Sequence, residues 1–474
     1  MPICHYCKRE IEMDWKYCHH CNKPLITNID IELNKRIQQS YDESPFYYSE
    51  VGIEEENYEV QAYYNEEIEE NLKKIEQDLS EKEQLGESIG DLLLKKASLF
   101  YKTRDFESTL KNLELALKNF SEDDDLLNIA ISHNEIGLLH EERGYFEQAI
   151  YNFDSALSIL EQIDDQQKVI QVLNNLGNIY YVLKEWEEAY NKYQTALDIS
   201  EKFEYELDSV RTSSNLVEIL FILKDYDRII KILKRNESFF KDNENIYGII
   251  QTRIKFGKLY YYYGEVYYDQ SYKFLNEALD LIERIKDQVS IYDKARLEWE
   301  CYLYLGKLNL MWDNDANAED FFLKSLSTIR TFEIQDHIKE GIVLEDIASF
   351  HALRGEDDSA IEYYSYASEI YEKFGDKEKI AELSTKIGKI YYDYVQNYIK
   401  TIEYYQKALN LYETLNSSKQ IAIILERLGD VSIANQDIES AIDYYERAKL
   451  HYEEIEDISE IESITKKLDS IKKV

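Results

Sequence analysis

The chain has 474 residues, of which 94 are acidic and 55 basic, so its formal net charge is −39. A field of this sign repels phosphate backbones and anionic lipid headgroups, so bulk binding to nucleic acid or to a membrane surface is disfavoured. Hydrophobic residues make up 44% of the chain, and the 3 prolines all lie at or before Pro45. The rest of the chain has material for a core and lacks the commonest helix breaker, which favours an all-α fold.

The amino terminus and the apolar residues predict where the protein resides. The first residues lack a positive segment followed by an apolar run, which is the pattern of a secretion signal. No apolar run approaches the roughly 18 residues that a membrane helix needs. The longest, from Leu216 to Leu223, is interrupted by Glu218. We therefore expect a cytoplasmic protein without a membrane span.

Four of the five cysteines lie in the first 21 residues, as two Cys-x-x-Cys pairs with ten residues between them. Thiolates with this spacing can surround one Zn²⁺ in tetrahedral geometry. Residues 1–27 are therefore predicted to form a zinc ribbon that holds one structural Zn²⁺ through Cys4, Cys7, Cys18 and Cys21. A disulfide pair or a redox dithiol is the alternative, which the absence of a secretion signal disfavours.

The role of the ribbon stays open. So small a module has too little core to fold alone, so zinc would supply its folding energy. Its net charge is only +1, from four basic and three acidic residues, and ribbons that bind nucleic acid usually carry more positive charge. The ribbon is interpreted as a structural module that docks a protein or packs on its own chain.

Residues 28–89 are predicted to be an acidic linker. Between Asn28 and Gly90, 18 acidic and 5 basic residues give a net charge of −13, which is typical of a solvated segment. Apolar residues at helical steps from Ile68 to Leu79 predict one amphipathic helix near residues 66–84. The alternative is that the linker folds back into the protein's own binding groove and inhibits it.

A pattern of small and large residues recurs nine times between residues 90 and 461. Small residues follow a small anchor at +12 and +19, and a large apolar residue follows it at +16. The first and fourth copies are degenerate, and two others carry insertions between their helices, since Ala278 lies at +21 from Gly257 and Ala408 at +20 from Gly388. The anchors are Ala97, Gly137, Gly177, Val217, Gly257, Gly306, Ala348, Gly388 and Gly429. Small residues let two antiparallel helices cross closely, and one hairpin cannot bury its apolar side alone, so neighbouring hairpins should stack into a solenoid. Gly144, Gly264 and Gly355, seven residues after their anchors, are predicted to end first helices in left-handed caps.

These residues resemble the tetratricopeptide repeat family over nearly four-fifths of the chain. Leu173-Asn-Asn-Leu-Gly-Asn-Ile-Tyr-Tyr, followed by Trp186-Glu-Glu-Ala-Tyr, is especially similar to the long repeats of kinesin light chains and Leu-Gly-Asn-type adaptors. The resemblance implies an all-α, right-handed superhelical solenoid of helix–turn–helix repeats over residues 90–461, with a capping helix over residues 462–474. The family's proline after the second helix is absent, which implies longer helices and a different superhelical pitch.

In this family the first helix of each hairpin lines a concave surface that binds peptides. The positions two or three before each anchor and one after it are therefore the candidate contacts. Copies two to four place amides there: Asn134, Asn174, Asn175, Asn178 and Asn215. Later copies place cations there: Lys255, Lys258, Lys307, Lys386, Lys389 and Arg427. Amides can pair with the backbone of an extended peptide, and cations suit an acidic one. The alternatives are a compositional bias toward asparagine and lysine, and ion pairs with neighbouring repeats.

No phosphate-binding loop, dinucleotide fingerprint or His-Glu-x-x-His motif occurs, so we expect no enzymatic activity. The leading hypothesis is an interaction scaffold that holds a peptide or helix of a partner protein in the groove. The alternative is a regulatory sensor, in which the ribbon contacts nucleic acid or transcription machinery and the repeats bind a peptide signal. A third possibility is homo-oligomerisation through the ribbon or the terminal repeats.

Overall fold

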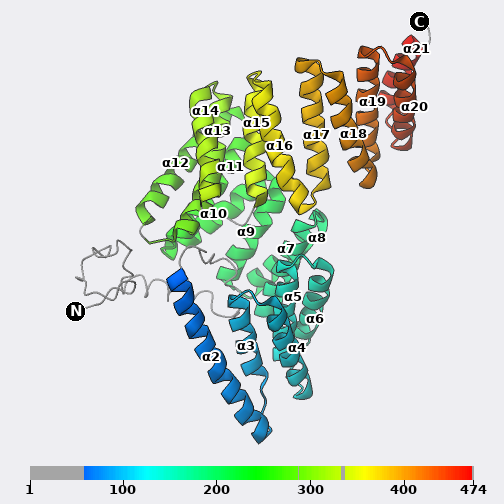
Figure 1. Ribbon diagram of the computed structural model, residues 1–474. Coiled ribbons are helices and arrows are strands. Elements are labelled where there is room, and N and C mark those ends of the chain that lie inside the picture. The colour runs from blue at the N-terminus through cyan, green and yellow to red at the C-terminus, as the bar shows by residue number, and fades with distance from the viewer. Residues whose placement is uncertain (1–57, 287, 332–336, 472–474) are drawn as a thin grey trace. The chain divides into compact units, whose positions relative to one another are not determined.

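The computed structural model describes residues 58–286, 288–331 and 337–471. The chain divides into two compact units, residues 1–239 and residues 240–474. All regular secondary structure of the described residues is helical, and they contain no β-strand (Figure 1). The predicted all-α class is therefore confirmed.

Unit 1 contains a long leading helix and then consecutive helical hairpins. The helices are α2 (Tyr58–Leu85), α3 (Gly90–Lys102), α4 (Phe106–Glu122), α5 (Leu126–Glu142), α6 (Phe146–Gln162), α7 (Gln166–Val182), α8 (Trp186–Lys202), α9 (Glu206–Ile222) and α10 (Tyr226–Asp242). The last residues of α10 belong to unit 2. Odd-numbered helices from α3 onward are the first helices of hairpins, and even-numbered helices are the second. Leu79 of α2 packs against the core of the first hairpin.

Unit 2 continues the same plan. Its helices are α11 (Ile246–Tyr263), α12 (Tyr268–Ile285), α13 (Ile291–Met311), α14 (Asp315–Thr331), α15 (His337–Leu353), α16 (Asp357–Phe374), α17 (Lys377–Ile390), α18 (Tyr398–Thr414), α19 (Ser418–Ala434), α20 (Ile438–Glu454) and α21 (Ile458–Ile471). Ile464 and Leu468 of α21 are buried in the core that α18 to α20 form, so α21 covers the end of this stack.

The anchor residues lie where the two helices of a hairpin cross. A Cβ atom built on Gly177 would lie 2.5 Å from the ring of Tyr193, and one on Gly429 would lie 2.4 Å from the ring of Tyr445. Both rings stand sixteen residues after their glycine, at the position where the repeat predicts a large residue. The small residues at +12 and +19, such as Ala189 and Ala196, are fully buried. The predicted repeat therefore describes real helix crossings, and the solenoid class is confirmed.

Three-residue turns join most helices and explain why proline is missing. The middle residue of each turn has a left-handed backbone conformation with positive φ. In unit 1 such residues recur every 20 positions: Arg104, Asp124, Gly144, Asp164, Lys184, Glu204 and Lys224. The next residue bonds back to the preceding helix, as Asp165 N–H does to the Leu160 carbonyl (3.1 Å). Its side chain can also cap the following helix, because the Asp165 carboxylate accepts from Lys168 N–H. Proline at this residue would remove the first of these bonds.

The predicted caps at Gly144, Gly264 and Gly355 all have positive φ, at 74°, 102° and 72°. The left-handed cap predicted at Gly264 is nevertheless wrong, because its ψ of −173° places it in an extended conformation that leads into the insertion. The repeats with insertions depart from the three-residue turn. A 3₁₀ turn, Glu265–Tyr267, separates α11 from α12. A π-helical turn, Tyr391–Val395, follows α17 and accommodates the extra residue of that repeat.

The division of the chain into domains stays a prediction. The zinc ribbon of residues 1–27 and most of the acidic linker lie outside the described residues. The amphipathic helix expected near residues 66–84 falls within α2, which begins at Tyr58. The capping helix expected over residues 462–474 falls largely within α21, which begins at Ile458.

Candidate peptide-contact surface

The first helices of unit 1 turn one stripe of side chains toward solvent. On α7 this stripe runs through Gln167, Gln171, Asn174 and Asn178, which are half-exposed or exposed. Asn175 lies one position off the stripe and is 6% exposed. The positions three before and one after the anchor are therefore accessible, whereas the position two before it faces the neighbouring repeat.

The predicted asparagines link successive first helices to one another. Asn175 Nδ2 donates to Asn134 Oδ1 (3.0 Å), and Asn215 Nδ2 donates to Asn174 Oδ1 (3.4 Å). Asn174 Nδ2 also donates to Thr212 Oγ1 (2.8 Å). The structure thus brings four of the five predicted amides into contacts between α5, α7 and α9. Peptide binding by these amides stays a prediction, and it competes with their bonds to each other.

Asn178 differs from the other amides because its bond lies within one hairpin. The Tyr193 hydroxyl donates to Asn178 Oδ1 (2.6 Å). The amide nitrogen of Asn178 makes no hydrogen bond in the part of the chain that the structure describes. Asn178 therefore has a fixed orientation and a donor left for another molecule.

The bond between the +16 tyrosine and the residue after the anchor recurs in unit 2. Tyr445 donates to Asp430 (2.6 Å), and the Tyr364 and Ser349 hydroxyls lie 2.9 Å apart. Where the +16 residue is Phe153 or Phe322, no hydroxyl is present at this position. Asn, Asp and Ser are therefore interchangeable as partners of the tyrosine, and the repeat does not require an amide at Asn178.

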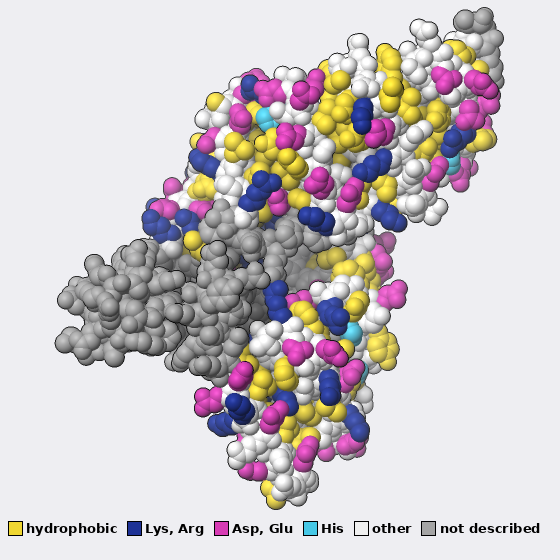
Figure 2. Space-filling model, viewed as in Figure 1, with side chains coloured by type: hydrophobic (Ala, Val, Ile, Leu, Met, Phe, Trp, Pro, Cys, Tyr) yellow, Lys and Arg dark blue, Asp and Glu magenta, His cyan; other side chains and the backbone are white. Residues whose placement is uncertain are grey.

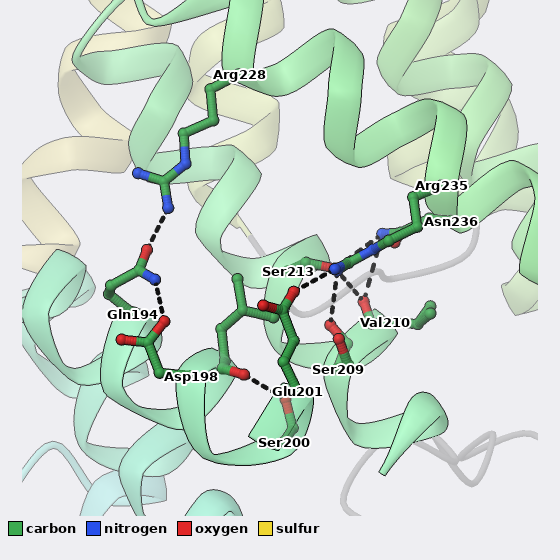
Figure 3. Close-up of polar contacts among 11 residues, drawn as sticks. Gln194, Asp198, Ser200, Glu201, Ser209, Val210, Ser213, Arg228, Arg235 and Asn236 are labelled. Carbon is green, nitrogen blue, oxygen red and sulfur yellow. Dashed lines mark hydrogen bonds and ion pairs between the residues drawn. The ribbon is translucent and has the colours of Figure 1, made fainter. Parts of the chain in front are cut away.

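In the fourth hairpin the +19 position holds Asn236 in place of a small residue, and this asparagine takes part in a buried polar network (Figure 3). Asn236 of α10 is 1% exposed and exchanges hydrogen bonds of 3.1 Å with Ser213 of α9. Arg228 and Arg235 on the same helix reach back to Gln194 and Glu201 of α8. The serine compensates for the asparagine, because a buried amide without partners would be costly.

Ion pairs occupy the predicted cationic positions of unit 2. Lys258 pairs with Glu300 (3.4 Å) and Lys307 with Asp346 (2.8 Å), in each case from one first helix to the next. Burial raises the pKa of Asp346, and Lys307 offsets only part of that effect. Cations that already hold carboxylates attract an acidic peptide weakly, so the predicted acidic ligand competes with the chain's own side chains.

Glu345 forms a cluster that the sequence reasoning did not identify. It is 9% exposed and accepts a hydrogen bond from the Tyr371 hydroxyl (2.7 Å). Lys379 and Lys386 lie 3.3 Å and 3.5 Å from its oxygens. Burial and the Glu345 carboxylate raise the pKa of Tyr371. Lys386 stands 41 residues after Glu345, the same offset as between Asn134 and Asn175, so this offset is the signal that could have found the cluster.

The remaining predicted cations do not gather into one site. Lys389 is the most exposed, with 62% of its side chain accessible, and lies 3.9 Å from Asp393. Arg427 hydrogen bonds to Tyr405, whose pKa burial raises to about 12. Lys255 lies half-buried on α11.

The predicted zinc ligands Cys4, Cys7, Cys18 and Cys21 lie outside the described residues. Within residues 58–286, 288–331 and 337–471, no three His, Cys, Asp or Glu side chains are grouped so that they could hold a metal ion. The helices of these ranges also include none whose length and apolar character would let it cross a membrane. A cavity of about 460 Å³ lies between α14, α15 and α16, and the Arg330–Glu340 ion pair (2.6 Å) borders it.

Comparisons with known families match two parts of the chain. The tetratricopeptide repeat model matches residues 170–203, which span α7 and α8. The model of the soluble NSF attachment protein, SNAP, matches residues 345–457. No curated protein sequence matches the chain.

Solved structures resemble the fold. A signal-transduction ATPase with a tetratricopeptide-repeat sensor from Pyrococcus horikoshii is 18% identical with a TM-score of 0.50, over 68% of this chain and 48% of that one. The apo quorum sensor NprR from B. thuringiensis is 14% identical with a TM-score of 0.49, over 78% and 99%. A Rap protein in complex with competence and sporulation factor is 14% identical with a TM-score of 0.46, over 81% and 99%. At these identities the likeness concerns the fold alone. The family model thus identifies a tetratricopeptide repeat at residues 170–203, and the structure places it within a helical solenoid of similar hairpins.

Proposed function

We propose that the protein is a non-enzymatic interaction scaffold that holds an extended peptide segment of a partner protein. The contact surface is the solvent-facing stripe of α5, α7 and α9, with Asn134, Asn174 and Asn178 as its polar groups. The observation that carries the proposal is the position of these amides, which are half-exposed, uncharged and fixed by hydrogen bonds.

An uncharged amide surface suits the backbone of a peptide. Each amide offers a donor and an acceptor, as each peptide unit does, so contact does not depend on the side chains of the ligand. Because neighbouring hydrogen bonds already hold the amides in place, binding loses less side-chain entropy than it would with mobile groups. The Asn178 N–H group is the donor that such a ligand would use first.

Substitution of Asn178 by Asp tests the proposal without disturbing the hairpin. Aspartate still accepts the bond from Tyr193, as Asp430 does from Tyr445 in the ninth hairpin, but it removes the donor and adds a charge. Asn178→Asp should lose the partner protein that wild type captures from its own cell lysate, with unchanged thermal unfolding. Asn191→Asp, at an exposed position of α8, is the matched control. Retention of the partner by Asn178→Asp would refute the contact surface.

We also propose that residues 1–27 bind one structural Zn²⁺. The two Cys-x-x-Cys pairs support this, since four thiolates complete a tetrahedral site. Metal analysis of the purified full chain should find one zinc per chain, and a Cys4→Ser/Cys7→Ser variant should lose it. Undiminished zinc in this variant would place the metal elsewhere.

A further inference from the structure

An exposed aromatic surface lies at the ends of α11 and α13 and at the start of α12. We call it the aromatic edge and define it by Tyr262, Tyr272, Met311 and Trp312, which are 44%, 40%, 46% and 40% exposed. Exposed apolar pairs end other first helices too, such as Val182 and Leu183, but the pair here adds a tryptophan and neighbouring tyrosines, and clusters of exposed apolar side chains mark contact surfaces. Unit 2 also brings other hydrophobic side chains to the surface, interspersed with charged ones (Figure 2).

Ring contacts hold two parts of the aromatic edge in place. The rings of Tyr272 and Trp312 meet edge to face with their centroids 5.5 Å apart. Tyr262 is fixed to α13 by its ring contact with Tyr304 (6.1 Å) and by a hydroxyl contact of 3.3 Å. Tyr262, Tyr272 and Trp312 are therefore held by ring contacts while part of each ring reaches solvent, which is the arrangement of interface anchors.

Uncompensated carboxylates border the aromatic edge. Glu265, Asp269 and Asp313 stand within a few residues of its members, and none of them makes an ion pair within the described part of the chain. The nearby cations already have acidic partners, because Lys273 lies 3.9 Å from Glu277 and Arg354 lies 2.7 Å from Asp315. The border of the aromatic edge is therefore negative.

Charge decides what this surface can hold. An anionic membrane and the acidic linker, with a net charge of −13 between residues 28 and 90, are both repelled by a negative border. A second copy of the chain brings another −39 and is disfavoured for the same reason. Cationic side chains are attracted both by the carboxylates and by the faces of Tyr and Trp rings.

We propose that the aromatic edge docks a segment of a partner protein in which Lys or Arg side chains stand next to apolar ones. The apolar side chains contact Tyr272, Met311 and Trp312, while the cations meet Glu265, Asp269 and Asp313. This surface lies at the ends of the helices and is distinct from the stripe of α5, α7 and α9.

Peptide selection on the full-length protein tests the proposal. A library of random short peptides displayed on phage is selected on wild type after depletion on a Tyr272→Ala/Trp312→Ala variant. Enriched sequences should combine Lys or Arg with aromatic or aliphatic residues. The best peptide, labelled with fluorescein, should bind the aromatic variant at least about tenfold more weakly than wild type. It should also bind an Asp269→Lys/Asp313→Lys variant more weakly, and the loss should shrink at high salt.

Leu450→Ala on α20 removes another exposed apolar side chain, at 64% exposure, and should leave peptide affinity unchanged. Circular dichroism establishes that each variant is folded, and the charge variant tests the surface without touching its aromatic rings. Three results would overturn the proposal: enriched peptides without basic residues, equal binding to the aromatic variant, or self-association of wild type that Trp312→Ala abolishes.

Discussion

Successive first helices meet through uncharged amides in unit 1 and through ion pairs in unit 2. Asn134 meets Asn175 in the first unit, and Glu345 meets Lys386 in the second, with the same separation of 41 residues. Stacking geometry therefore fixes which positions meet, whereas the chemistry of the pair is free to differ. The difference leaves uncharged amides on the contact surface of unit 1, beside Arg211 and Glu218 of α9, and ion-paired charges on the corresponding surface of unit 2.

The largest expected effect on stability comes from substitution of Glu345 in unit 2. Glu345→Ala should destabilise this unit by about 3 kcal/mol, because the buried Tyr371 hydroxyl loses its bond to a charged acceptor and Lys379 and Lys386 lose an ion-pair partner. Hydrogen exchange of α15 to α18 and urea unfolding measure the loss. Glu382→Ala removes a carboxylate that is 42% exposed and should cost far less. Equal costs would mean that burial of the cluster is unimportant.

The corresponding change in unit 1 should cost less. Asn175→Ala leaves the Asn134 oxygen without its donor and should destabilise α5 to α7 by about 2 kcal/mol, since the bond that it breaks joins two uncharged groups. Asn191→Ala, on the exposed side of α8, is the control and should be nearly neutral. Hydrogen exchange resolved by helix compares the variants, and a loss as large as that of Glu345→Ala would contradict the distinction between the units.

A carboxyl group in unit 1 that has no cationic partner should make this unit sensitive to pH. Burial raises the pKa of Glu141 to about 7, so the folded state binds more protons than the unfolded state between the ordinary pKa and about 7. Stability contributed by this group therefore falls as pH rises through this window. Glu141→Gln should stabilise unit 1 by about 1 kcal/mol near pH 8 and by much less near pH 5.

Thermal unfolding of wild type and Glu141→Gln at both pH values checks this prediction. Glu142→Gln, next to it and exposed, is the control. An equal gain at both pH values would indicate that the substitution acts through something other than ionisation.

The smallest expected effect on stability comes from added salt. Roughly 1 M NaCl should weaken the partly exposed pairs of unit 2, such as Lys307–Asp346, by about 0.5 kcal/mol each. The amide contacts of unit 1 should not change. Hydrogen exchange of α13 and α15, set against α5 and α7, separates the two responses. Equal responses would mean that the ion pairs add nothing to stability.

The repeat could be predicted from sequence because packing dictates it. Only a small residue fits where Tyr193 crosses Gly177, so the anchors and the large residues show up as a period. The left-handed turns were predicted at three glycines only. Residues such as Asp164 and Lys184 adopt the same backbone with positive φ, and their residue types give no such signal, because the hydrogen bonds of the turn stabilise the conformation.

The candidate site could be predicted only in part. Its helix faces follow from the period, but the accessibility of each position depends on the angle at which neighbouring hairpins stack. Asn174 and Asn175 are adjacent in sequence, yet one faces solvent and the other is buried. The ion pairs of Lys258 and Lys307 likewise depend on which carboxylates the next helix brings near. A single sequence does not specify that alignment.

Site-specific photocrosslinking tests the proposed contact surface most directly. A benzophenone side chain replaces Gln171, which lies on the solvent-facing stripe of α7 beside Asn174 and Asn178. The same side chain at Asn191, on the outer side of α8, is the control. Irradiation in the protein's own cells should join one partner protein to position 171 and not to position 191. Crosslinking of that partner at position 191 alone, or equally at both positions, would contradict the account.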